Sequence, residues 1–100
     1  MDPAGLSALV DAIRHLHGVE ATWIESVPVR QEHEGQVVWE GEVQVFAVAH
    51  PKAKRVYAWS HESGPGGKRR FHAVLGAPPV DSPEKAVRVA IVGEFRRAQN

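Results

Sequence analysis

The chain has 100 residues, twelve basic and twelve acidic side chains, and no cysteine. A chain of this length forms one domain, because each half of it would be too short to bury a sufficient core. The lack of cysteine excludes disulfides, thiolate metal ligands and a cysteine nucleophile, and the balanced charge argues against a generally basic nucleic-acid-binding protein. We expect residues 1–100 to form a single domain. The lack of an apolar run of roughly 20 residues predicts a cytoplasmic location without membrane contact.

The first predicted element is a helix from Asp2 to His17. Asp2 suits the N-terminal cap, Pro3 suits the first helical position, and Gly18 suits the left-handed residue that ends a helix. The apolar residues recur at the spacing of one helical face, and they are Leu6, Leu9, Val10, Ile13 and Leu16. This pattern predicts an amphipathic helix.

Between Val19 and Leu75 the pattern changes to alternation, which is typical of strands with one buried face. Turn residues at 33–35, 50–54 and 63–67 divide this region. We predict four strands, at about 21–30, 36–49, 55–61 and 68–75. Pro28 cannot donate to a ladder, which favours a sheet edge for the first strand.

A second helix is predicted from Pro83 to about Arg97, because Ser82 suits its N-terminal cap and Glu84 its positive first turn. The order of elements then predicts an α+β fold. In this fold, a two-layer sandwich of the order α-β-β-β-β-α, a four-stranded antiparallel meander carries both helices on one face.

The register of the strands decides which side chains share a face, since a slip by one residue turns every side chain over. We expect Val29 opposite Trp39, Ala47 opposite Ala58, and Ala58 opposite Ala73. This register collects apolar residues, Trp23 among them, beneath the two helices and leaves the other face of the sheet open.

The predicted open face carries aromatic, imidazole and guanidinium groups. An exposed apolar patch of this kind usually marks an interface, although cross-strand aromatic pairs also stabilise sheets without any further role. The predicted binding residues are Phe46, Tyr57, Trp59, His61, Arg70 and His72.

The leading functional hypothesis is a non-catalytic domain that binds a protein partner, or a second copy in a homodimer, through this open face. One alternative is a single-stranded nucleic-acid-binding module, with bases stacked on the aromatic rings and phosphates neutralised by residues 68–70. A second alternative is a small enzyme that uses Glu40, Glu42 and His72, although no nucleophile–base pair accompanies them.

The six histidines do not indicate a metal site. His15 and His17 point in different directions on a helix, and no third ligand accompanies His61 and His72. We therefore predict neither a metal nor a cofactor.

The charges are unevenly distributed along the chain. Residues 1–50 hold two basic and eight acidic side chains, whereas residues 51–100 hold ten basic and four acidic ones. This asymmetry is compatible with nucleic-acid binding, with stabilisation of the sheet, and with association between unlike patches of two molecules.

Overall fold

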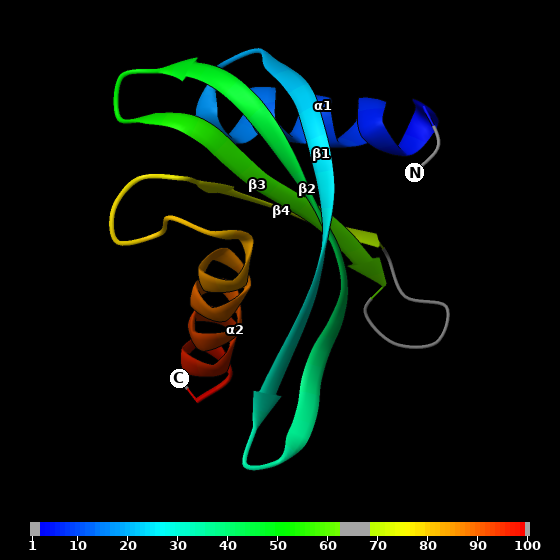
Figure 1. Cartoon of the computed structure of the whole chain (residues 1–100), viewed down its shortest axis with the longest axis vertical. Coiled ribbons are helices and arrows are strands. Elements are labelled where there is room, and N and C mark those ends of the chain that lie inside the picture. Colours follow the sequence, from blue (N-terminus) through cyan, green and yellow to red (C-terminus); the bar gives the residue numbers. More distant parts are fainter. Residues whose placement is uncertain (1–2, 63–68, 100) are drawn as a thin grey trace.

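The computed structural model describes residues 3–62 and 69–99. Its elements follow the order α1 (Pro3–His17), β1 (Ala21–His33), β2 (Gln36–His50), β3 (Ala53–Glu62), β4 (Arg69–Leu75) and α2 (Pro83–Gln99) (Figure 1). The strands form one antiparallel sheet in the order β1-β2-β3-β4. The predicted α+β class, the order of elements and the meander are confirmed. The predicted turn at 63–67 lies outside the described residues, and neither described helix is long and apolar enough to cross a membrane.

Local signals set the end of α1 and the first hairpin. Gly18 has a φ of +69°, and its N–H donates to the Arg14 carbonyl at 2.8 Å, which is the predicted left-handed helix end. Glu34 and Gly35, with φ values of +52° and +78°, form a two-residue turn between β1 and β2. Two positive φ values in such a turn match the twist of the strands it joins.

The β1–β2 hairpin extends beyond the rest of the sheet. In the pairing of β2 with β3, His50 lies opposite Ala53 at one end, and Gln44 lies opposite Ala58 at the other. Beyond that pair, β2 continues beside β1, and β3 continues beside β4 (Figure 1). The sheet therefore divides into two diverging ribbons.

The two helices lie on opposite faces of the sheet (Figure 1), which corrects the prediction of both helices on one face. Helix α1 packs through Leu9 and Ile13 against one core, formed with Phe46, Val56 and Ala58. Helix α2 packs through Ala86 and Val87 against a separate core, formed with Val29, Val43, Val45, Tyr57, Trp59 and Val80. The molecule thus has three layers, with a helix on each side of the sheet.

The physical reason for this difference is the register between the two central strands. Ala47 pairs with Arg55, and Ala58 pairs with Gln44, so this register differs by three residues from the expected one. An odd difference reverses the side on which β3 residues lie relative to β2 residues. The expected pairing of Ala58 with Ala73 is confirmed. Val29 pairs with Gly41 rather than with Trp39, a difference of two residues that leaves its face unchanged.

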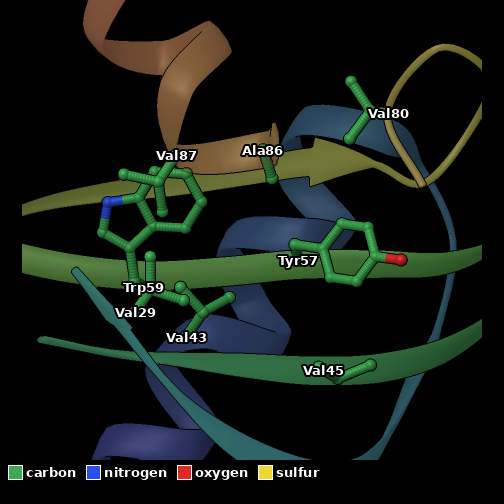
Figure 2. Packing of buried hydrophobic residues seen from close by; sticks show 8 residues of the cluster. All are labelled: Val29, Val43, Val45, Tyr57, Trp59, Val80, Ala86 and Val87. Carbon is green, nitrogen blue, oxygen red and sulfur yellow. The ribbon is translucent and has the colours of Figure 1, made fainter. Parts of the chain in front are cut away.

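The α2-side core is built around Trp59. In Figure 2, Trp59 lies between Val87 of α2 and Val29 and Val43 of the β1–β2 ribbon. The Trp59 ring stacks on His72 with a centroid separation of 5.1 Å, and it meets the Trp39 ring edge-on at 6.0 Å. These aromatic contacts add to the area buried by Trp59.

A contact from α1 closes one position on the outer edge of β4. Gly76 donates to Arg55 of β3, so the even-numbered residues of β4 direct their backbone groups toward β3, and Ala73 directs its carbonyl outward. His17 donates from Nε2 to this Ala73 carbonyl at 2.8 Å. The last turn of α1 is thereby tied to the sheet edge.

Candidate interaction surface

The aromatic residues predicted to form an exposed row lie in two separate cores. Phe46 is fully buried beneath α1, whereas Tyr57 and Trp59 are buried beneath α2 on the other face. The expectation of an open aromatic face is therefore wrong. The cause is the odd register difference between β2 and β3, which divides the expected row between the two sides of the sheet.

The remaining predicted residues do not form one site. His72 is half-buried against Trp59, and Arg70 is exposed on the same strand. The backbone of His61 pairs with Arg70, but the side chain of His61 lies outside the described part of the structure. Glu42 pairs with Pro28 on the α1 side of the sheet, so it lies on the opposite face from His72. The structure does not bring the proposed enzyme residues together.

Helix α1 leaves part of its side of the sheet uncovered, and we call this part the open half-face. Trp23 pairs with Phe46, whose side chain contacts α1, and Ser60 continues the face of Ala58. Alternation along the strands places the other members on the same side. The open half-face consists of Trp23, Ser26, Pro28, Glu42, Gln44, Ser60 and Phe71.

Trp23 is exposed yet held in a fixed orientation. Its Nε1 donates to Gln44 Oε1 at 2.8 Å, and Gln44 Nε2 donates to Ser26 Oγ at 3.0 Å. The Gln44 residue is only 2% exposed, whereas Trp23 is 46% exposed. A buried amide thus fixes one edge of the indole ring while much of the ring contacts solvent.

Sequence reasoning placed Trp23 in the core and missed this role. The register shifts between Trp23 and Glu25, because a β-bulge at this position accommodates Ile24 as an extra residue. The bulge reverses the alternation, so Trp23 shares a face with Ser26 rather than with Val27. A bulge of this kind has no clear sequence signal, and strict alternation therefore assigned Trp23 to the wrong side.

A small hollow opens where β2 and β3 diverge, and Gln44, which holds Trp23, is one of its lining residues. Its volume is about 220 Å³, and it is lined by Leu9, Glu42, Gln44, Trp59 and Ser60. Phe71 is 40% exposed and pairs with Ser60, which lines the hollow. Sites for small molecules usually measure roughly 300–1,000 Å³. The hollow suits a single side chain better than a cofactor, and its carboxylate, amide and hydroxyl groups suit a donor or a cation.

The ribbon next to the hollow is acidic. Arg30 Nη2 lies 3.5 Å from Glu32 Oε1, and Arg30 Nε lies 3.7 Å from Glu40 Oε2. One guanidinium group thus offsets part of the charge of two carboxylates. Glu42 is exposed and forms no ion pair with any residue in the part of the chain that the structure describes. The open half-face therefore has negative charge at the hollow.

A basic patch lies at the opposite end of β2, and we call residues 50–55 the basic turn. Lys52, Lys54 and Arg55 are exposed there, and the Lys52 N–H donates to His50 Nδ1 at 3.0 Å. A hollow of about 380 Å³ lies between this turn and Gly76. Among the described residues, no carboxylate forms an ion pair with these three cations.

The groups with altered pKa values lie outside the open half-face. Arg14 donates to both carboxylate oxygens of Glu20 at 2.8 Å, which lowers the pKa of Glu20 and raises the pKa of Arg14. Burial beneath α2 raises the pKa of the Tyr57 hydroxyl above 10.0, since burial disfavours the phenolate. Neither effect supplies an acid or a base to the hollow.

Among the described residues, no group of three or more His, Asp or Glu side chains is placed to hold a metal ion. Comparison of the chain with models of known protein families, with curated proteins and with solved structures finds no match. The open half-face and the basic turn are therefore the features of the molecule that bear on its function.

Proposed function

We propose that this chain is a small, non-catalytic interaction domain that binds a protein partner through the open half-face. The observation that supports this proposal is the exposed indole of Trp23, which Gln44 holds in place. Tryptophan side chains supply much of the binding energy at protein interfaces. A ring that is already fixed also loses little conformational freedom on binding. The proposal retains the cytoplasm as the location, which fractionation of the source cells would test.

The charge around Trp23 supports a partner with a basic segment. Glu42 lines the hollow and forms no ion pair with any described residue, and the exposed Phe71 pairs with Ser60 at its lining. A lysine or arginine side chain that enters this hollow would meet a carboxylate and hydrogen-bond acceptors beside aromatic rings, all of which attract cations.

The two alternative functions lack comparable support. Single-stranded nucleic acid would have to stack its bases on Phe46, Tyr57 and Trp59, which are buried in two separate cores. An enzyme that uses Glu42 and His72 together would need both groups on one side of the sheet, but they lie on opposite faces.

The proposal is tested by capture of binding proteins from the source cells with a tagged chain, followed by titration calorimetry of each purified candidate. We expect Trp23→Ala to weaken the affinity by about tenfold or more, as truncation of an interface anchor does. Val89→Ala is the control, since Val89 is an exposed apolar residue on α2. Equal affinity of the wild type and Trp23→Ala would contradict the proposal, as would failure to obtain any purified protein whose binding depends on Trp23.

A further inference from the structure

Exposed side chains of opposite charge lie toward different ends of β2. Toward one end, the β1–β2 ribbon has exposed carboxylates and a single arginine, Arg30; the carboxylates are Glu32, Glu34, Glu40 and Glu42. At the other end, the basic turn has three exposed cations. Each molecule therefore has an acidic surface and a basic surface that cannot neutralise each other within one chain.

Carboxylates close to the basic turn are already engaged elsewhere. Ala21 pairs with Val48, so Glu20 lies at the same end of the sheet as the turn, but Glu20 is bound by Arg14. Asp81, whose charge acts together with that of Arg55 on the Tyr57 hydroxyl, forms an ion pair with Lys85 at 3.1 Å. The cations of the basic turn consequently attract negative groups from another molecule.

Resting on the proposed function, we propose that the partner of the open half-face is the basic turn of a second copy of this chain. A lysine of the turn enters the hollow beside Glu42, and the aliphatic parts of the turn contact Trp23 and Phe71. The turn projects from the sheet at a hairpin, which lets it reach a concave surface on another molecule. Charge complementarity between the two surfaces selects this occupant over an unrelated apolar segment.

The charge distribution also favours a second copy over a nucleic acid as the ligand of the basic turn. A polyanion that extends along β2 from the turn would approach the carboxylates of the acidic ribbon and be repelled. A second copy presents the same ribbon to the turn as an attractive surface. Because each molecule has both surfaces, the contact joins unlike patches, and assembly continues beyond the dimer unless two reciprocal contacts close it.

The association should be weak and sensitive to salt, because exposed ion pairs contribute little individually and are screened. Sedimentation velocity over a range of protein concentrations, at about 20 mM and about 300 mM NaCl, measures it. We expect concentration-dependent association at the lower ionic strength, with an association constant that falls by about tenfold or more at the higher one. A wild-type chain that stays monomeric at low salt up to the solubility limit would overturn the inference.

A charge exchange between the two surfaces identifies the contact. The turn variant carries Lys52→Glu and Lys54→Glu, and the ribbon variant carries Glu40→Lys and Glu42→Lys, all at exposed positions. Each variant alone should be monomeric, since its two surfaces then have the same sign. An equimolar mixture should associate, because the reversed turn complements the reversed ribbon. If the wild type associates but the mixture does not, another contact is responsible and the inference fails.

A control variant with Arg88→Glu reverses one charge on the exposed surface of α2 and leaves the ion pair between Asp81 and Lys85 in place. It should associate like the wild type. Circular dichroism of all variants establishes that they fold. If a single-stranded oligonucleotide binds the monomeric wild type and not the turn variant, the basic turn is a nucleic-acid site and the inference is overturned. A chain that does not self-associate but binds another protein through Trp23 would refute this inference and leave the proposed function standing.

Discussion

The indole Nε1 of Trp23 and the side-chain Oε1 of Gln44 are joined by a hydrogen bond of 2.8 Å across neighbouring strands. Gln44 is almost fully buried, and its amide nitrogen donates in turn to Ser26. A polar side chain in this position is stable because both ends of its amide have partners. The pair links the interior of the sheet to the exposed ring on which the proposed function depends.

Replacement of Gln44 should destabilise the fold and release Trp23. Gln44→Met keeps the approximate length of the side chain but removes both hydrogen bonds, so we expect a loss of about 1–3 kcal/mol in the free energy of unfolding. Urea denaturation measures this change. The exchange of the Trp23 indole proton with water, followed by NMR, should also become faster. An unchanged exchange rate would show that the bond does not restrain the ring.

Substitutions in the two cores should have independent effects on the free energy of unfolding. Ile13 is fully buried beneath α1, and Val87 is nearly fully buried beneath α2, with the sheet between them. We expect Ile13→Ala to cost about 2–5 kcal/mol and Val87→Ala on the order of 2 kcal/mol. In a double-mutant cycle their effects should add to within about 0.5 kcal/mol. A coupling energy above about 1 kcal/mol would indicate that the helices share one core.

Gly41 leaves space for the ring of Trp39, which lies against it on the same strand. A Cβ atom at Gly41 would lie 3.1 Å and 3.2 Å from Trp39 ring atoms, closer than ordinary contacts. Gly41→Ala should displace the Trp39 ring from its contact with Trp59 and destabilise the protein by about 1–3 kcal/mol. The near-ultraviolet circular dichroism of the tryptophans should change as well.

Gly93 provides the matched control for this prediction. It lies in α2, and a Cβ atom there would meet no atom within 4 Å. Gly93→Ala should stabilise the protein by about 0.5–1 kcal/mol, because alanine favours a helix over glycine. Destabilisation by both substitutions to the same extent would argue against the steric explanation for Gly41.

Tyr57 is the only tyrosine of the chain, so its ionisation can be followed without interference from another phenol. Burial raises its pKa in the folded protein above the ordinary value of 10.0. The folded state therefore holds the proton more tightly than the unfolded state does. The corresponding stability is fully present below pH 10.0 and is lost as the pH rises through the folded pKa.

Absorbance near 295 nm should accordingly show an apparent pKa above 10.0 in the native protein and a value of about 10 in urea. Tyr57→Phe should remove this contribution to the loss of stability at high pH. A native titration at the ordinary value would mean that the hydroxyl is solvated rather than buried.

The sequence predicted the features that short segments determine by themselves. The start of α2 at Pro83, the end of α1 before Gly18 and the turn at Glu34–Gly35 all agree with the structure. Capping side chains, proline and glycine act within one turn of the chain, so their effect does not depend on distant residues. The order of elements and the meander followed from these local signals.

The faces of the sheet depend on both central strands, and alternation alone did not determine them. β2 contains the continuous apolar run Val45–Ala49, and β3 contains the run Val56–Trp59. Such runs are typical of strands covered on both sides, and this signal could have indicated a helix on each face. Within these runs, both the odd-numbered and the even-numbered residues are apolar, so either set can form a core. The odd register difference between β2 and β3 therefore moved residues of β3 to the other face without placing a charge in the interior.

The contact between His17 and the Ala73 carbonyl has a consequence for how copies of this chain can meet. Unprotected outer strands recruit strands from other molecules, which leads to fibrils and disordered aggregates. An incoming strand at β4 would need that carbonyl as an acceptor, so it would first have to detach the helix terminus that occupies it. A further strand can therefore pair with β4 at this position only after partial unfolding. This requirement protects the native molecule from polymerisation through backbone pairing at this edge.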